Sequence, residues 1–123
     1  MAFLNKKNSM FKEGTVGLLT VCLKNKKTIG FIELKINEEN NIAELSYIFD
    51  YDFCNKGYCT EAAKKLVEVG FKNLKLSYIF ADIVKGNISS KRVVEKLGFK
   101  YKNSTNKNLI IFLNYYLYNN NIN

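Results

Sequence analysis

Apolar residues in this chain fall into short runs separated by polar turns. Residues 16–23, 28–36 and 42–49 are rich in Val, Ile, Leu, Phe and Tyr, and the polar segments 25–27 and 37–41 separate them. Runs of this length between turn-forming residues predict three consecutive strands, and the first two are close enough in sequence to form a hairpin.

The following segments alternate between helical and strand spacing. Apolar residues in 60–72 recur every three or four positions, which predicts a helix. Residues 78–84 predict a further strand, and 89–97 a short helix. Ser89 is a suitable N-cap for this helix and Gly98 a suitable C-cap.

The C-terminal part predicts two more strands joined by a polar loop. The first begins at 100–102, the loop covers 103–108, and the last strand covers 109–118. Residues 1–14 are polar and poorly patterned, and we expect the polar tail 119–123 to fray.

The order of these elements is β-β-β-α-β-α-β-β. It predicts an α/β (α+β) fold in which a mixed, mostly antiparallel sheet is flanked by helices. The chain has 123 residues and neither an internal repeat nor an interdomain linker, so we interpret 1–123 as a single domain.

Composition narrows the class of protein. Hydrophobic residues make up 47% of the chain, enough for a buried core, but no apolar run approaches the ~20 residues of a membrane span. The N-terminus lacks the features of a signal peptide, so we expect a cytoplasmic protein without a membrane partner. The cysteines Cys22, Cys54 and Cys59 are then expected to be reduced thiols.

The absence of histidine excludes several kinds of chemistry. With no His and no pair of closely spaced Cys residues, we expect no metal site, and Ser–His or Cys–His nucleophilic catalysis is excluded. The net charge of +8 comes from lysines that are scattered along the chain. We interpret it as a solvated basic surface that helps to capture polyanions. A small RNA-binding domain is a weaker interpretation, since no aromatic platform for single strands is present.

The junction of the third strand with the first long helix is the most informative segment. It reads Cys-Asn-Lys-Gly-Tyr-Cys-Thr-Glu-Ala over 54–62. A loop that leads into a helix leaves free backbone N–H groups at the positive end of the helix dipole, and Gly57 allows an anion to approach the backbone closely. Such a junction is either a phosphate site or a plain structural turn.

A second segment, Asn-Ile-Ser-Ser-Lys-Arg-Val-Val-Glu-Lys-Leu-Gly-Phe over 87–99, follows the next strand. Together, in this order, the two segments resemble the GNAT superfamily of acyl-CoA-dependent N-acetyltransferases. The resemblance is strongest to its ribosomal-protein N-terminal acetyltransferase branch (RimJ/RimL-like), and it covers roughly 28–118. It implies a GNAT fold, which agrees with the order of elements predicted from the sequence pattern.

The resemblance implies that acetyl-CoA binds in a cleft where the strand before the loop and the strand after the helix splay apart. Backbone groups of the first of these strands would pair with the pantetheine arm as an added strand would, and loop amides would hold the pyrophosphate. The alternative for Tyr47, Ile48 and Phe49 is an ordinary central strand that is paired on both sides. The alternative for Asn87 is a loop residue that caps a helix or forms a turn. The residues that the resemblance assigns to acetyl-CoA are Tyr47, Ile48, Phe49, Asn55, Lys56, Gly57, Tyr58, Cys59, Thr60 and Asn87.

Two cysteines depart from the family pattern. Many members carry Gln or Arg where Cys54 stands, and Gly or Ala where Cys59 stands. Cys59 is small enough to fit, although it narrows the approach to the phosphates. Packing is the alternative role for both thiols.

Glu44 is the candidate general base. It lies among apolar residues on the strand before the loop, where several GNAT enzymes carry a base, and desolvation would raise its pKa. Ser90 is the candidate proton donor to the leaving thiolate, because Val94 occupies the position at which other branches have Tyr. The alternatives are a solvent-facing strand residue for Glu44 and a first-turn helix residue for Ser90. We interpret Glu61 as structural, since a carboxylate in the first turn favours the helix dipole.

The predicted function is transfer of an acetyl group from acetyl-CoA to the primary amine of a protein N-terminus or a small molecule. The alternative is a non-catalytic acyl-CoA-binding or interaction module. Because residues 1–14 are weakly patterned, we expect the family's first strand and the helices that wall the acceptor side to be reduced. The strand 16–23 would then lie at an exposed sheet edge, which predicts self-association into a homo-oligomer and weak activity of the isolated monomer.

Overall fold

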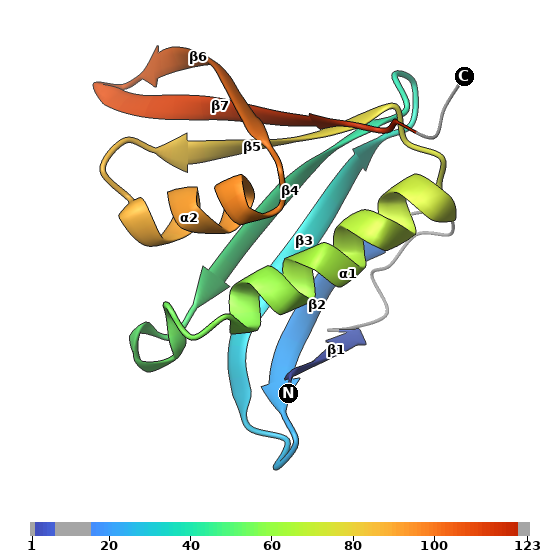
Figure 1. Cartoon of the computed structure of the whole chain (residues 1–123), viewed down its shortest axis with the longest axis vertical. Helices are drawn as coiled ribbons and strands as arrows, with labels where there is room; N and C mark the ends of the chain where they lie inside the picture. The colour runs from blue at the N-terminus through green and yellow to red at the C-terminus, as the bar shows by residue number, and fades with distance from the viewer. Residues whose placement is uncertain (1, 7–15, 121–123) are drawn as a thin grey trace.

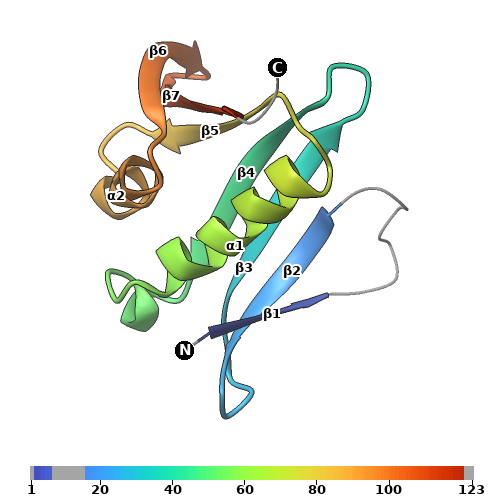
Figure 2. The same cartoon turned by 45° about the vertical axis from the view of Figure 1, so that its right-hand side comes forward.

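A computed structural model of the chain describes residues 2–6 and 16–120. Its strands form one sheet in the order β1-β2-β3-β4-β5-β7-β6, and both helices lie on one face of that sheet (Figures 1 and 2). The fold class is therefore the one predicted. The elements are β1 (Ala2–Lys6), β2 (Val16–Leu23), β3 (Thr28–Asn37), β4 (Ile42–Phe49), η1 (Tyr51–Phe53), α1 (Tyr58–Lys72), β5 (Tyr78–Val84), α2 (Ile88–Lys96), β6 (Lys100–Lys107) and β7 (Ile110–Tyr118).

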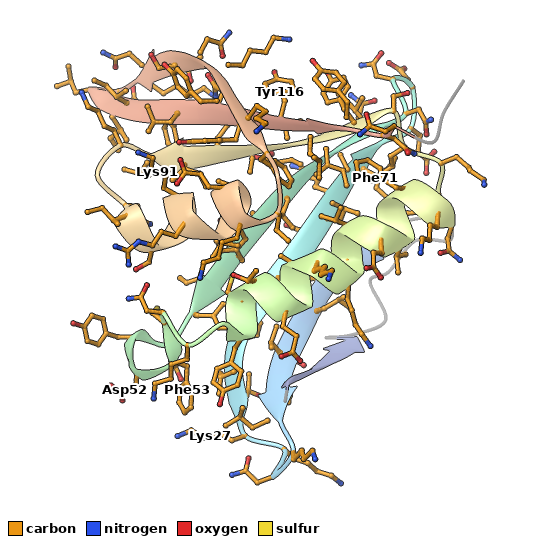
Figure 3. The ribbon with its side chains drawn as sticks, viewed as in Figure 1. Lys27, Asp52, Phe53, Phe71, Lys91 and Tyr116 are labelled. Carbon is orange, nitrogen blue, oxygen red and sulfur yellow. The ribbon has the colours of Figure 1, made fainter. Side chains whose placement is uncertain are left out.

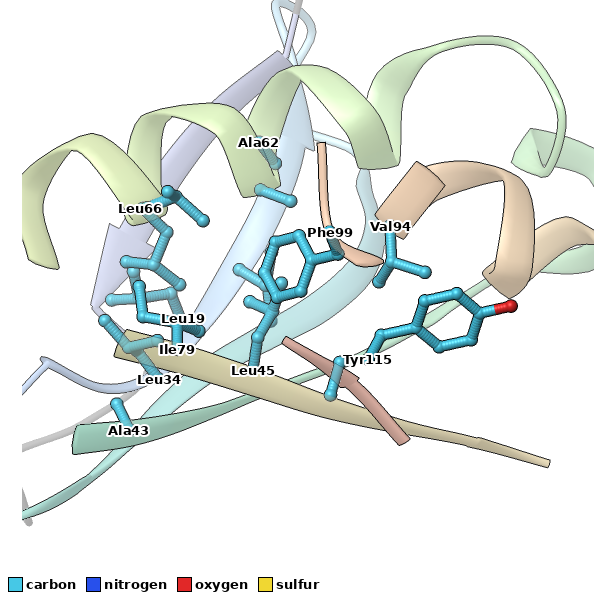
Figure 4. Close-up of a cluster of buried hydrophobic side chains, with 14 of the residues drawn as sticks. Leu19, Leu34, Ala43, Leu45, Ala62, Leu66, Ile79, Val94, Phe99 and Tyr115 are labelled. Atoms are coloured by element: carbon cyan, nitrogen blue, oxygen red, sulfur yellow. The ribbon is translucent and has the colours of Figure 1, made fainter. Parts of the chain in front are cut away.

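The core lies between the sheet and the two helices. Alternate residues of the central strands point toward the helices, so Leu45 of β4 and Ile79 of β5 are almost completely buried. Helix α1 covers them with one apolar face that includes Leu66, and α2 contributes Val94 (Figure 4). Neither helix of the described ranges reaches the length and apolarity that crossing a membrane requires.

The sheet opens between β4 and β5. These strands are parallel and pair over only three positions, Ile42 with Tyr78, Ala43 with Ile79 and Glu44 with Phe80. Beyond Glu44 the two strands diverge (Figure 1), and β5 pairs along its whole length with β7 instead. The opening follows the splayed strands that the family resemblance implies.

The first strand is present, contrary to our prediction. Strand β1 pairs antiparallel with β2, from Ala2 opposite Leu23 to Lys6 opposite Leu19. Strand β2 is therefore not the edge of the sheet, because β1 takes that place. The predicted reduction of the wall on the acceptor side concerns the segment between these two strands, and residues 7–15 lie outside the described part of the chain.

The C-terminal boundaries also differ. The loop predicted at 103–108 is wrong, because β6 continues to Lys107 and pairs with β7. All eight residues of β6 are exposed, so its backbone pairing needs no apolar face. Asn119 does not fray: its backbone N–H donates to the Ser77 carbonyl, and its Nδ2 donates to the carbonyls of Phe71 and Leu76.

Helix α1 begins two positions before the predicted start, and α2 has a different cap. The N-cap of α2 is Asn87 and not Ser89, since the Ser90 N–H donates to Asn87 Oδ1 at 3.1 Å. At the other end, Gly98 has a φ of 93° and allows the N–H of Phe99 to donate back to the Val94 carbonyl. This Schellman turn ends α2 as the predicted glycine cap required.

Candidate functional site

A pocket of about 620 Å³ lies where β4 and β5 separate. The end of β4, the loop before α1 and the first turns of α2 enclose it. Its lining residues are Tyr47, Ile48, Phe49, Tyr51, Cys54, Asn55, Gly57, Cys59, Thr60, Asn87, Ser89, Ser90, Arg92, Val93 and Lys96.

The N-terminus of α1 supplies backbone donors to this pocket. Its N-cap is Gly57, at a φ of 85°, and Gly57 has no side chain to bond the amides of the first turn. The Gly57 carbonyl accepts from the N–H of Glu61, so the amides of Tyr58, Cys59 and Thr60 precede the helical hydrogen-bond ladder. The dipole of this 15-residue helix adds positive potential at the same place. Such an end is suited to an anion such as a phosphate.

The far part of β4 presents an unpaired backbone edge. Tyr47, Ile48 and Phe49 follow the last β4–β5 pair, and on their other side they pair with β3. Their β5-side backbone groups face the opening, and all three residues line the pocket. An extended ligand can bond such an edge as an added strand.

A side-chain hydrogen bond joins the two walls of the pocket. The hydroxyl of Tyr47 on β4 donates to the backbone carbonyl of Ser90 on α2 at 2.8 Å. Burial raises the pKa of Tyr47 well above its ordinary value. The phenol therefore remains a protonated donor at neutral pH.

Asn87 and Ser90 both line the pocket from the start of α2. The Oδ1 atom of Asn87 is used as the helix cap, which leaves its Nδ2 group as the donor for a ligand. Capping and ligand binding are therefore compatible roles for Asn87, and one does not exclude the other.

Glu44 does not line the pocket. Ala43 and Leu45 point into the core, so the side chain of Glu44 lies on the opposite face of the sheet, at the last β4–β5 pair. Burial and the nearby carboxylate of Asp82 raise the pKa of Glu44, and Lys35 and Lys107 oppose this shift. The carboxylate of Glu44 is thus half-buried at the point where the opening begins. It lies on the same strand as the pocket residues 47–49, but on the face of the sheet away from the helices.

Lys56 and Tyr58, which were predicted to bind the cofactor, do not line the pocket. The ring of Phe53, labelled in Figure 3, lies below the Nζ of Lys56 at 5.5 Å and that of Lys27 at 4.9 Å. Tyr58 packs beside the same ring, with 6.2 Å between centroids. The side chains of Lys56 and Tyr58 therefore lie beside Phe53, and neither residue is among those that line the pocket.

Two basic side chains that we did not predict also line the pocket. Arg92 and Lys96 extend from α2 and line it. Their spacing of four residues places them on one face of a helix, and that spacing, together with Asn87 at the helix start, could have identified them. Tyr51 and Ser89 were missed as well, and nothing in the local sequence distinguishes them.

The cysteines are free thiols, and two of them border the pocket. Burial, and to a lesser extent Cys54, raises the pKa of Cys59 to about 12. Cys54 Sγ lies 3.4 Å from the Asp50 carbonyl. At neutral pH the Cys59 thiol is protonated, which favours packing over nucleophilic chemistry.

Comparison with known proteins identifies a family. The family model described as the acetyltransferase (GNAT) domain matches residues 2–100. The uncharacterized N-acetyltransferase YnaD of Bacillus subtilis (strain 168) is 40% identical over 57 residues, which are 46% of this chain and 34% of the relative. The chain thus spans about a third of the length of this curated relative.

Solved structures agree in fold. The acetyltransferase (GNAT family) from Bacillus anthracis superposes with a TM-score of 0.76 and 27% identity, covering 83% of this chain and 66% of that one. Ribosomal-protein-S5-alanine acetyltransferase from Vibrio fischeri superposes with a TM-score of 0.78 and 21% identity, covering 85% and 62%. The second likeness shows a common fold only.

Proposed function

This chain belongs to the GNAT acetyltransferase family, and from that membership we propose that it transfers an acetyl group from acetyl-CoA to a primary amine. One observation carries the proposal. Strands β4 and β5 part after three paired positions, and the unpaired edge of β4 lines a pocket that also receives the N-terminus of a helix.

The groups around the pocket fit acetyl-CoA. The amides of the first turn of α1 provide uncapped donors for a pyrophosphate, and Arg92 and Lys96 provide cations for phosphate groups. The backbone of 47–49 provides alternating donors and acceptors for the two amides of a pantetheine arm. The Nδ2 of Asn87 provides a further donor.

The chain's own residues then have distinct roles in the chemistry. Acetyl-CoA supplies the acyl group as a reactive thioester. Glu44 accepts a proton from the acceptor amine, directly or through water, and its raised pKa suits this task. A backbone N–H of β4 stabilises the negative charge that develops on the carbonyl oxygen. Ser90, or a water beside it, supplies the proton to the leaving sulfur.

The experiment combines binding and turnover. Calorimetry measures the affinity for CoA and acetyl-CoA, and a thiol reagent measures CoA release with a panel of primary amines. A control with protein alone corrects for the three cysteines of the chain. Binding with amine-dependent release supports the proposal. Binding without release for any amine supports the non-catalytic acyl-CoA module instead, and absence of binding overturns both.

We further propose that the chain acts as a single domain in the cytoplasm, where its three thiols remain reduced. Self-association remains a prediction, but the edge strands that would mediate it differ from the strand predicted from the sequence. Strand β1, and not β2, now provides the N-terminal edge of the sheet, and β6 provides the other edge. Light scattering tests self-association, and a monomer over the whole accessible concentration range would contradict it.

A further inference from the structure

The face of the sheet away from the helices carries a group of polar side chains beside the β4–β5 opening. Alternation along each strand places Glu44, Asp82 and Asn114 on this face, because their strand neighbours, among them Ala43 and Ala81, point into the core. Asp82 lies directly opposite Asn114 in the β5–β7 register. Strands β4, β5 and β7 thus contribute one group each.

Asn114 is buried and only partly satisfied. It is 7% exposed, and its Nδ2 donates to Asp82 Oδ1 at 2.5 Å. Its Oδ1 is buried and has no hydrogen-bond partner in the described part of the chain. The amide is therefore oriented by Asp82 while its own oxygen is left unpaired, and an unpaired buried polar atom is uncommon in folded proteins.

The described cations act on these carboxylates only from a distance: Lys35 and Lys107 lower the pKa of Glu44 without pairing with it. Within residues 2–6 and 16–120, neither Glu44 nor Asp82 forms an ion pair. The charged groups close enough to influence Glu44 are Asp82 and Glu33, which are acidic, and Lys35 and Lys107, which are basic. Two half-buried carboxylates at one opening, in a protein with a net charge of +8, form a local acidic site that favours a cationic ligand.

Aromatic rings border the carboxylates on the same face. Phe80 is paired with both Glu44 and Tyr116 in the sheet. The rings of Phe80 and Tyr116 stack with 5.9 Å between centroids, and Figure 3 labels Tyr116. The Nζ of Lys102 already lies 4.7 Å from the Tyr116 centroid. An ammonium group is therefore well accommodated on this aromatic surface.

We infer that the acceptor amine approaches from this face and that Asp82, positioned by Asn114, binds its ammonium beside Glu44. This inference rests on the proposed acetyl transfer and names the acceptor class as amines that are cationic at neutral pH. The ammonium passes one proton to Glu44, which returns it to solvent. The C–N bond then forms as the C–S bond breaks, and the second proton of the nitrogen ends on the CoA sulfur.

The test is Asp82→Asn, which preserves shape and removes the charge. With a primary alkylamine as acceptor, KM should rise about 10-fold or more, while kcat and the acetyl-CoA Kd change little. With an arylamine, which is neutral at pH 7, KM should not change. Glu33→Gln is the matched control, because it removes an acid from the same face at a greater distance from the opening.

A second variant tests the positioning residue. Asn114→Leu removes the donor to Asp82 together with the unpaired oxygen. It should raise KM for the alkylamine but not for the arylamine, a difference that a merely structural role would not produce. This variant gives the same readout if Asp82→Asn does not fold. Equal alkylamine KM in the wild-type protein and the folded variants overturns the inference alone. Absence of acetyl-CoA binding by the wild-type protein overturns the proposed function, and the inference with it.

Discussion

The two sides of the β4–β5 opening differ in charge and in the kind of group they present. The helix side presents backbone amides, Arg92 and Lys96 around a pocket of about 620 Å³. The opposite side presents the carboxylates of Glu44 and Asp82. Because successive residues of a strand point to opposite faces, one pair of diverging strands separates the proposed polyanion site from the proposed cation site.

The difference also predicts how each side responds to mutation. In the proposed function the helix side binds acetyl-CoA mainly through backbone groups, so changes that fill space or strain the loop should disturb it most. The opposite side depends on individual side chains, so an isosteric substitution is sufficient to remove its contribution. Mutations should therefore divide into those that change cofactor affinity and those that change turnover or acceptor KM.

The largest expected effect comes from Glu44→Gln. Loss of the base should lower turnover about 100-fold at neutral pH and less at high pH, where more of the acceptor amine is already neutral. The affinity for CoA should not change, because Glu44 does not line the pocket. Calorimetry and a pH profile of kcat/KM measure both quantities, with Glu33→Gln as the control. A variant with full turnover would assign proton removal to water or another residue.

Glu44→Gln should also change the pH dependence of stability. Because burial raises the folded-state pKa of Glu44, the native state favours the protonated carboxyl. That contribution to stability is present at low pH and is lost as pH rises through the raised pKa. Gln is neutral at every pH, so Glu44→Gln should raise Tm by about 2 °C at pH 7 and by less at pH 4. Equal shifts at both values would contradict this sign.

Gly57→Val tests the helix side. In the described part of the chain, a side chain at position 57 would meet no residue other than its chain neighbours within 4 Å of its Cβ, and the φ of 85° disfavours Val. CoA affinity should fall roughly 10- to 100-fold, because the side chain crowds the amides and the strained loop shifts.

Gly86→Val is the matched control for Gly57→Val. Gly86 has a φ of 97° and an equally open Cβ position, but it does not line the pocket. Both variants should lose similar stability, and only Gly57→Val should lose most of its CoA affinity in calorimetry. If both variants lost CoA affinity equally, backbone strain at the substituted glycine, and not crowding of the pocket, would explain the effect.

Ser90→Ala tests the proton donor with a smaller expected effect. Turnover should fall about 10-fold, since water can partly replace the hydroxyl, and the Kd of CoA should remain unchanged. Ser89→Ala is the control, because Ser89 also lines the pocket at the adjacent position. Similar turnover in both variants would exclude a specific role for Ser90.

The two sides also differ in how far the sequence predicts them. The loop before α1 and the start of α2 are continuous segments, so their local pattern predicted many of the residues that line the pocket, but not Arg92 and Lys96. The Asp82–Asn114 pair joins residues 32 apart on neighbouring strands. It depends on the β5–β7 register, which the sequence pattern does not specify.

Strand β1, most of β6 and the anchoring of Asn119 were not predicted, for a related reason. Strand β6 is polar throughout, and all its residues are exposed, so it shows no apolar alternation. Strand β1 has only five residues and is identified through its pairing with β2. The anchoring of Asn119 likewise depends on carbonyls more than 40 residues away in sequence. Hydrogen bonds to other segments of the chain define these parts.

The smallest expected effect concerns the bond that holds the pocket walls together. Tyr47→Phe removes the 2.8 Å hydrogen bond to the Ser90 carbonyl but retains the ring. The free energy of unfolding should fall by about 1 kcal/mol, as for a typical intramolecular hydrogen bond. CoA affinity should fall only about threefold, because α2 loses one of its ties to β4 while the backbone donors remain.

Tyr51→Phe is the matched control, since Tyr51 lines the same pocket but is 92% exposed. It should change neither quantity in chemical denaturation or calorimetry. The Tyr47→Phe effect should also be independent of pH between 6 and 9, because the raised pKa of Tyr47 keeps its hydroxyl protonated there. Unchanged stability in Tyr47→Phe would show that the pocket walls are held by packing and not by this bond. A loss of CoA affinity as large as that of Gly57→Val would instead show that the helix side depends on side chains as strongly as the opposite side does.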